Sequence, residues 1–320
     1  MAVSTAIQST PLTGLHLLLT YECNYECDHC FVWGGPSQNG TMSYETIELI
    51  LQQAEEAGTI EWIYFEGGEP FLYYELLCSG VQLAHERGFK VGIVSNAFWA
   101  ASDEEAMTCL QPFAGVVEDL SISHDIYHGS KDQPRQTFIA RKAAGQLGIP
   151  VDFIKVAGSE VSAEQVVTGQ FPVDESTVLY RGRAAEKLAA RVRPKPWYQF
   201  TECKWEELRH PERVHVDTYG NLHICQGISV GNLFASPLAE IMAGYDAHAH
   251  PIIGPLLVGG PVELVNRYGL AHQPTYADAC HLCYLSRSSL RNRFPGILVP
   301  RQMYGEKQST PTSKCGIQPL

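Results

Sequence analysis

The chain has 320 residues, enough for one large domain or two modest ones. Its 23 Lys and Arg residues against 35 Asp and Glu give a net charge of −12; such a surface repels phosphates and anionic lipid, so we expect no nucleic acid partner and no membrane partner. Residues 1–14 lack a basic start and a long apolar segment, and no later stretch is long enough to span a bilayer, so we expect a cytoplasmic protein.

The first half of the chain alternates short apolar runs with amphipathic stretches. The apolar runs predict strands at residues 15–19, 62–65, 90–94, 117–122 and 151–156. The stretches between them predict helices at residues 43–57, 75–87, 102–110 and 137–147, with Ser43 and Ser102 as N-caps. This rhythm is typical of parallel βα units, whose functional residues lie on loops at the carboxyl ends of the strands.

The pattern changes beyond about residue 160. Pro194 and Pro196 indicate a linker, and residues 254–261, rich in Gly and Pro, indicate a loop. Residues 214–217 and 222–225 alternate around a turn at Tyr219-Gly220-Asn221, which predicts a β-hairpin. We therefore expect a second, smaller domain in this part of the chain.

Ten cysteines in a chain without an export signal favour metal or catalytic roles over a disulfide scaffold. Three of them, Cys23, Cys27 and Cys30, follow the first predicted strand with the spacing CxxxCxxC. Three thiolates can hold three corners of a cubic 4Fe–4S cluster and leave the fourth iron free for another ligand. A metal centre on this loop is therefore a better explanation than three spare core cysteines.

A glycine pair follows the second predicted strand, in the run Glu66 to Pro70. Glycines let the backbone approach a ligand closely, and an acidic neighbour suits an ammonium group. Together with the cysteine loop, this run resembles the motifs of the radical S-adenosylmethionine (radical SAM) superfamily. The resemblance implies an α/β fold with a partial (β/α)6 TIM-like barrel over residues 12–180, and S-adenosylmethionine bound by Gly67, Gly68, Glu69 and Pro70.

Two further strand ends resemble cofactor-binding positions of this superfamily. Ser95 and Asn96 occupy a place where a polar residue contacts the ribose. Ser123 and Asp125 occupy a second such place, but His124 is inserted before the acid. This departure leaves open which of the two faces the ribose; ordinary polar turn residues are the alternative.

Three other side chains are candidates for cofactor contacts. His29 stands one place before the third cysteine, where the superfamily often has an aromatic residue or histidine near the adenine. Arg135 and Arg141 carry guanidinium groups that suit bidentate pairing with the cofactor carboxylate. For both arginines a solvated helix face is the alternative.

A second group of four cysteines provides soft ligands for a tetrahedral zinc ion or a 4Fe–4S cluster, and spacing alone leaves both open. The group resembles the auxiliary-cluster domains known as SPASM and twitch, and residues 181–184 resemble the segment that precedes them. Residues 284–314 contain no cysteine for a further cluster, so the resemblance implies the twitch form, a β-hairpin plus helix over residues 196–320. Its one auxiliary 4Fe–4S cluster would be held by Cys203, Cys225, Cys280 and Cys283.

Three cysteines stand apart from both sets. Cys78 and Cys109 fall in predicted helices, where we expect core positions. Cys315, near the end of the sequence, is a candidate catalytic hydrogen-atom donor or extra ligand, with an untethered thiol as the alternative.

The resemblance implies an enzyme that reductively cleaves S-adenosylmethionine to a 5′-deoxyadenosyl radical, which then removes a hydrogen atom from substrate. We expect a small-molecule substrate that is oxidised or rearranged, with a flavodoxin- or ferredoxin-type electron donor. The main alternative is a maturase that crosslinks or epimerises a ribosomal peptide; it is less favoured because the first strand, near residue 15, leaves no room for a preceding peptide-recognition domain. A non-enzymatic iron–sulfur carrier or sensor would explain the cysteines but not the glycine motif.

Overall fold

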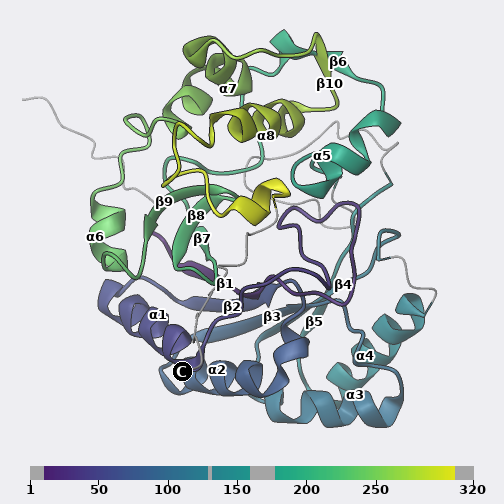
Figure 1. Ribbon diagram of the computed structural model, residues 1–320. Coiled ribbons are helices and arrows are strands. Elements are labelled where there is room, and N and C mark those ends of the chain that lie inside the picture. Colours follow the sequence, from purple (N-terminus) through teal and green to yellow (C-terminus); the bar gives the residue numbers. More distant parts are fainter. Residues whose placement is uncertain (1–10, 129–131, 159–176, 307–320) are drawn as a thin grey trace, which may run out of the picture.

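The computed structural model describes residues 11–128, 132–158 and 177–306. Their largest element is an eight-stranded sheet with the order β5-β4-β3-β2-β1-β7-β8-β9 (Figure 1). The strands from β5 to β7 pair in parallel, and the last two pair antiparallel. The strands are β1 (Gly14–Thr20), β2 (Trp62–Gly67), β3 (Lys90–Ser95), β4 (Asp119–Ser123), β5 (Val151–Ile154), β7 (Arg213–Val216), β8 (Asn221–Cys225) and β9 (Ile228–Asn232).

These strands confirm the α/β prediction. Within the described residues the sheet runs from β5 to β9 and does not close on itself. Four helices that connect the parallel strands lie along one side of it, at the bottom of Figure 1. They are α1 (Tyr44–Ala57), α2 (Tyr74–Glu86), α3 (Asp103–Leu110) and α4 (Gln133–Leu147).

The helix boundaries follow the predicted caps. The side chains of Ser43 and Ser102 accept hydrogen bonds from the first turns of α1 and α3, and Gly58 ends α1 in a left-handed conformation. Phe65 of β2 is fully buried and points toward α1 and α2. Because side chains alternate along a strand, Tyr64 and Glu66 point to the opposite face, which we call the inner face of the sheet.

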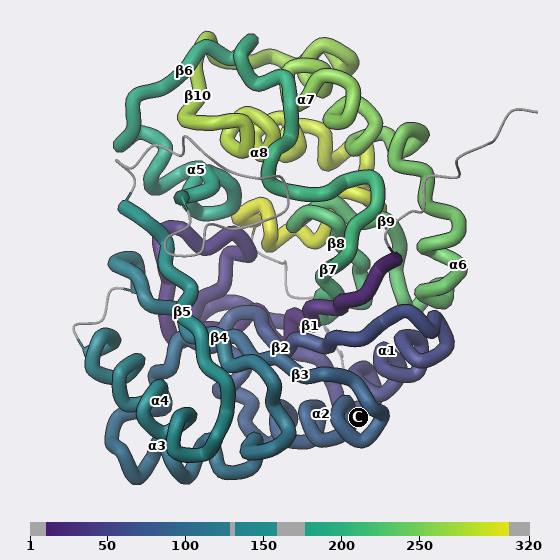
Figure 2. The backbone as a smooth tube through the Cα atoms, turned by 180° about the vertical axis from the view of Figure 1, so that it is seen from behind, coloured from purple at the N-terminus to yellow at the C-terminus, as the bar shows by residue number. Residues whose placement is uncertain are grey.

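Most of the later part of the chain lies across the sheet from α1–α4, in both Figure 1 and the reverse view of Figure 2. The helix at residues 238–243 is an exception, because it packs against α1. The later part of the chain joins the parallel strands directly, because β7 pairs with β1. The two parts of the chain thus share one sheet, while their division into domains at residues 12–180 and 196–320 stays a prediction. The remaining elements are α5 (Arg183–Lys187), β6 (Lys195–Pro196), α6 (Leu238–Ala243), α7 (Ile253–Tyr268), β10 (Thr275–Tyr276), α8 (Ala279–Leu290) and five 3-10 turns: Pro70–Tyr73, Gln111–Phe113, Ala189–Arg191, Trp197–Gln199 and Arg301–Tyr304.

Two expectations for this part were wrong. Residues 254–261 lie in α7 and not in a loop; Leu256 and Leu257 pack against the core, and the glycines produce only a break in the helix at Gly259 and Gly260. The expected linker at Pro194–Pro196 is partly a strand, because β6 pairs antiparallel with β10. In both places packing overrides the local preference of Gly and Pro for loops.

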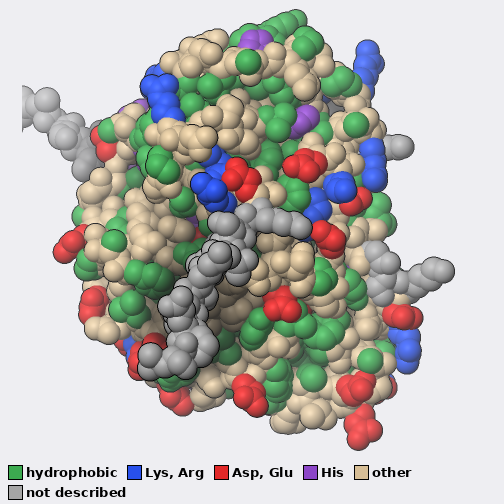
Figure 3. Space-filling view, viewed as in Figure 1, with side chains coloured by type: hydrophobic (Ala, Val, Ile, Leu, Met, Phe, Trp, Pro, Cys, Tyr) green, Lys and Arg blue, Asp and Glu red, His purple; other side chains and the backbone are tan. Residues whose placement is uncertain are grey.

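The surface shows no single charged region on the face in Figure 3, where acidic and basic side chains are interspersed among the described residues. In the part of the chain that the structure describes, none of the helices combines the length and apolarity needed to cross a bilayer.

Candidate functional site

The loop after β1 carries the CxxxCxxC cysteines. Cys23 and Cys27 are buried, Cys30 is half-buried, and all three are free thiols. Backbone N–H groups donate to two of the sulfurs: Tyr25 N lies 3.4 Å from Cys23 Sγ, and Gly34 N lies 3.2 Å from Cys30 Sγ. Such bonds favour the thiolate, the form that binds iron. Burial raises the pKa of Cys23 to about 12, whereas a bound cation would favour its thiolate.

The end of β2 lies against this loop through paired backbone groups. Gly68 N donates to Thr20 O at 2.6 Å, and Glu69 N donates to Glu22 O at 2.9 Å. A Cβ at position 68 would lie 2.0 Å from the carbonyl oxygen of Glu22, so this approach requires glycine. The structure therefore brings the glycine motif and the cysteine loop together.

The Glu69 carboxylate is fully buried and joins the motif to the end of β3. It accepts hydrogen bonds from Phe71 N (3.1 Å), Ser95 Oγ (2.9 Å) and Asn96 N (2.8 Å). Burial raises its pKa to about 7 despite these donors. Because Glu69 and Ser95 hydrogen-bond to each other inside the protein, they hold the ends of β2 and β3 together. Pro70 is also buried and begins the short 3-10 turn that follows.

Asn96 connects β3 to the cysteine loop. Its side-chain amide donates to Asn24 Oδ1 at 2.8 Å and lies 3.8 Å from Cys23 Sγ. The residue is 5% exposed, so its side chain makes its hydrogen bonds to protein atoms and not to solvent. Asn96 thus belongs to the surroundings of the first cysteine, next to the place expected for the cofactor.

His29 and Asp125 lie together at the end of β4. His29 Nε2 is 3.3 Å from Asp125 Oδ2, and the His29 ring stacks on Tyr127 with 4.8 Å between ring centres. Asp125 Oδ1 accepts from Tyr127 N and contacts His128 Nδ1 at 3.0 Å. Although burial opposes ionisation, the two imidazoles hold the pKa of Asp125 well below its usual range. The result is a flat aromatic surface fixed beside the cysteine loop.

The remaining candidates of this group lie farther out. The Ser123 side chain is half-buried, and its carbonyl accepts from Gln133 of α4. Arg135 is exposed on the first turn of α4, and Arg141 lies over the Phe153 ring at 5.5 Å. These positions match the alternative of a solvated helix face for Arg135.

The second cysteine set surrounds one enclosed cavity. Cys225 comes from β8, Cys280 and Cys283 come from α8, and Cys203 comes from the segment before β7. All four are free thiols, and burial raises the pKa of Cys203 to about 12. The hairpin, the distant CxxC and the separate cysteine therefore converge, as their sequence pattern indicates.

Two buried arginines line the same cavity. Arg181 Nη1 donates to Cys225 Sγ at 3.1 Å and pairs with Glu206 at 2.7 Å. Arg287 is 1% exposed and donates to Gln226 O at 2.9 Å. Neither Nε atom has a hydrogen-bond acceptor among the described residues. The cavity thus combines four sulfurs with two compensating positive charges and unused donors, which fits an anionic iron–sulfur cluster.

The spacing of the sulfurs bears on the choice between zinc and a cluster. In a tetrahedral zinc site with bonds of about 2.3 Å, neighbouring sulfurs lie about 3.8 Å apart. Among the described residues, the only group of three or more ligand atoms within 4.8 Å of one another is His16, Glu66 and His215. Both cysteine sets are therefore more open than a single zinc ion requires.

A short segment connects the two cysteine sites. Arg183 Nη1 donates to Cys27 O at 2.7 Å and Arg183 N donates to Cys30 O at 2.9 Å, while Arg181 stacks over the Phe31 ring at 5.2 Å. Gly182 between them has φ +59°, and a Cβ there would lie 2.5 Å from Phe31 Cα. The sequence identified this segment only by its resemblance to the one that precedes auxiliary-cluster domains. Its contacts with both cysteine sites were not predicted, although the two arginines on either side of a glycine were visible in the sequence.

The separate cysteines take no part in these contacts. Cys78 and Cys109 lie on α2 and α3, where they are half-buried against the core. Cys315 lies outside the described residues.

Comparison with known proteins identifies the class to which this site belongs. Residues 17–134, which contain the cysteine loop and the glycine motif, match the model of the radical SAM superfamily. Residues 17–134 of this chain therefore carry a radical SAM domain.

The chain is similar over part of its length to proteins that are named for different activities. The chain is 31% identical over 111 residues to the putative peptide biosynthesis protein YydG of Bacillus subtilis (strain 168), covering 34% of this chain and 35% of that protein. It is 30% identical over 82 residues to the S-adenosylmethionine-dependent nucleotide dehydratase of Selenomonas ruminantium, covering 26% and 29%. These matches span about a third of the relatives' length or less. A solved structure of BtrN with AdoMet and 2-DOIA aligns with 73% of this chain and 82% of that one, at 14% identity and a TM-score of 0.46.

The connecting segment yields a prediction with a matched control. Gly182→Ala should lower the free energy of unfolding by about 3 kcal/mol or more, because φ +59° with ψ −136° is a combination that favours glycine and because a Cβ would also meet the Phe31 backbone. Gly269 lies in the ordinary left-handed region, with φ +59° and ψ 41°, and has nothing within 4 Å of a Cβ, so Gly269→Ala should cost only about 1 kcal/mol. Urea unfolding of the two variants measures the difference; equal losses would show that neither the backbone conformation of Gly182 nor its contact with the cysteine loop constrains position 182.

Proposed function

We propose that this chain is a radical SAM enzyme that splits S-adenosylmethionine reductively and uses the resulting 5′-deoxyadenosyl radical to remove a hydrogen atom from its substrate. The backbone pairing of Gly68 and Glu69 with the cysteine loop carries this proposal. An iron–sulfur carrier or sensor would need the cysteines but not a second motif fixed beside them.

The residues around the first site fit the cofactor. Cys23, Cys27 and Cys30 would hold a 4Fe–4S cluster, which supplies the electron for cleavage when S-adenosylmethionine is bound at its open iron. Gly68 lets its backbone pack directly against Glu22, and a methionyl amine would be held at this junction of the motif and the loop. The stacked rings of His29 and Tyr127 offer a surface for the adenine.

We further propose one auxiliary 4Fe–4S cluster of the twitch kind on Cys203, Cys225, Cys280 and Cys283. The open spacing of the sulfurs and the two buried arginines support a cluster over zinc. Ligation by four thiolates would suit it to accept one electron from the substrate radical, so that the net reaction is a two-electron oxidation. Arg181 and Arg287 would stabilise the added negative charge.

A small polar molecule is the substrate class that the inner face supports. Tyr64 of β2 and Asp119 of β4 are joined across Gly92 of the intervening strand β3, and Asp152 lies opposite Ser121 on the same face. Hydrogen-bonding and charged groups of this kind can orient hydroxyl and amino groups of a substrate on the inner face.

Modification of a peptide is the second candidate. It is favoured by the similarity to YydG, which is named as a putative peptide biosynthesis protein. A short precursor peptide encoded next to the gene would support this candidate over a small molecule.

The proposal predicts two separable functions for the cysteine sets. After anaerobic reconstitution the protein should hold about eight irons, and with dithionite it should convert S-adenosylmethionine to 5′-deoxyadenosine. Replacing Cys23, Cys27 and Cys30 by Ala should remove about four irons and abolish this conversion. Replacing the four later cysteines should also remove about four irons but leave 5′-deoxyadenosine formation in place.

The matched control is the pair Cys78→Ala and Cys109→Ala, which should retain both the iron content and the conversion. Wild-type protein that holds iron but forms no 5′-deoxyadenosine above a cluster-free control would support the carrier or sensor. Four irons with one zinc would contradict the auxiliary cluster.

Arg181 yields a prediction about the potential of the auxiliary cluster. Arg181→Gln removes a cation bonded to Cys225, which should make the one-electron potential more negative by about 60 mV or more, corresponding to about 1.5 kcal/mol for a hydrogen bond to a charged group. Redox titration followed by EPR measures the shift. Arg191→Gln, at an exposed arginine, should leave the potential unchanged. Equal potentials in the wild type and Arg181→Gln would argue against a redox centre in this cavity.

A further inference from the structure

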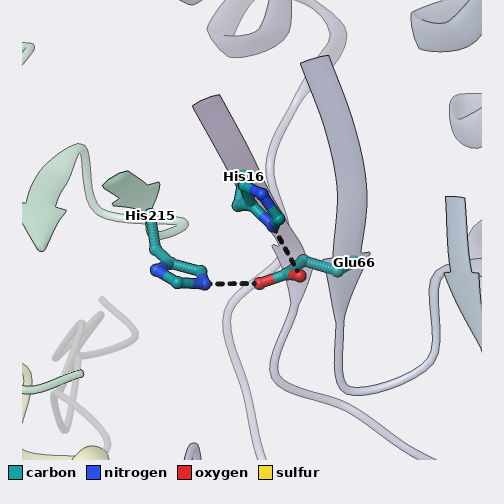
Figure 4. Close-up of side chains that lie close together, drawn as sticks. All are labelled: His16, Glu66 and His215. Atoms are coloured by element: carbon teal, nitrogen blue, oxygen red, sulfur yellow. Dashed lines mark hydrogen bonds and ion pairs between the residues drawn. The ribbon is translucent and has the colours of Figure 1, made fainter. Parts of the chain in front are cut away.

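Three side chains of metal-binding type meet on the inner face of the sheet, apart from both cysteine sets. His16 lies on β1, Glu66 on β2 and His215 on β7 (Figure 4). His16 is the register partner of His215 on one side and of Tyr64 on the other. Glu66 follows two residues after Tyr64, so all three side chains point to one face.

Their ligand atoms have the spacing of neighbours around one ion. His16 Nδ1 lies 3.0 Å from Glu66 Oε2, and His215 Nε2 lies 3.2 Å from Glu66 Oε1. One nitrogen from each imidazole and one carboxylate oxygen lie within 4.8 Å of one another. With metal–ligand bonds of about 2.1 Å, adjacent ligands are about 3 Å apart, so the three can converge on a shared ion with little movement.

The group is incompletely satisfied by the protein. Glu66 Oε1, which faces His215 Nε2, is buried, yet it has no well-directed hydrogen bond among the described residues. The contact between His215 and Glu66 is therefore close without being a well-directed hydrogen bond. An unpaired buried carboxylate oxygen is uncommon in a purely hydrogen-bonded cluster and points to a missing ligand.

The surroundings hold the group in place and leave it accessible. The His16 ring stacks on Tyr64 at 4.6 Å with an interplanar angle of 10°. The side chains of His16 and Glu66 are each 13% exposed and that of His215 is 17% exposed, so an ion can enter. Asp119 and Asp152 lie on the same face, and the positive charge of Arg213 acts on Glu66 and His215.

We infer that His16, Glu66 and His215 bind a divalent transition-metal ion. Two imidazoles and one carboxylate suit Mn²⁺, Fe²⁺, Co²⁺ and Zn²⁺, and three protein ligands leave coordination positions open. These positions face the inner side of the sheet, where an oxygen or nitrogen atom of a small ligand can complete the coordination. The site is independent of the proposed radical chemistry and joins the two parts of the chain through β1 and β7.

Manganese provides a direct test on the full chain with its iron–sulfur clusters assembled and oxidised, because occupied cysteines no longer compete for the ion. Titration with Mn²⁺, followed by the EPR signal of free Mn²⁺, should show one ion bound per chain. Glu66→Gln and His215→Asn should each weaken binding at least tenfold, and His210→Ala, at an exposed histidine, should bind as the wild type does. Pulsed EPR of the wild-type complex should show nitrogen couplings from two imidazoles.

Mn²⁺ that stays free, or that binds the wild type without imidazole nitrogen couplings, would overturn the inference and leave a hydrogen-bonded cluster. The same holds if Glu66→Gln and His215→Asn bind Mn²⁺ as tightly as His210→Ala. Because the pulsed EPR measurement needs no variant, a substitution that fails to fold does not remove the test.

Discussion

The bonds between Arg183 and the carbonyl groups of the cysteine loop are the constraint on which both cysteine sites depend. They fix Cys27 and Cys30 from a segment that lies far away in the sequence. Two residues earlier, Arg181 donates to Cys225 in the second cavity. The three residues from Arg181 to Arg183 thus contact both cysteine sites, although the two sites share no ligand.

The parallel pairing of β7 with β1 has a second consequence. It extends the sheet of the radical SAM domain with a strand from the later part of the chain, and it carries the hairpin of Cys225 with it. His215 reaches the inner face only because of this register. The inner face is thus built from both parts of the chain, and a substrate held there would contact residues from each.

The features of this architecture that are decided within a few residues could be predicted from the sequence. Those that depend on contacts between distant residues could not. The serine caps and the cysteine and glycine motifs could be recognised because each is decided within a few residues. The group of His16, Glu66 and His215 could not, since it depends on the register between strands far apart in the sequence. Residues 254–261 were mistaken for a loop because glycine and proline favour one locally, whereas apolar packing makes them part of α7. Arg135 was a candidate to pair with the cofactor carboxylate because of its guanidinium group. Only the fold shows that this side chain is exposed on α4.

The central claim is that two iron–sulfur clusters lie on either side of the Arg181–Arg183 segment. Anomalous diffraction from anaerobically grown crystals of the reconstituted protein, recorded at the iron and zinc edges, tests it most directly. The account predicts an iron cluster bound by Cys23, Cys27 and Cys30, and a second one enclosed by Cys203, Cys225, Cys280 and Cys283. A zinc signal in the second cavity, or iron confined to the first site with the later cysteines unligated, would contradict it.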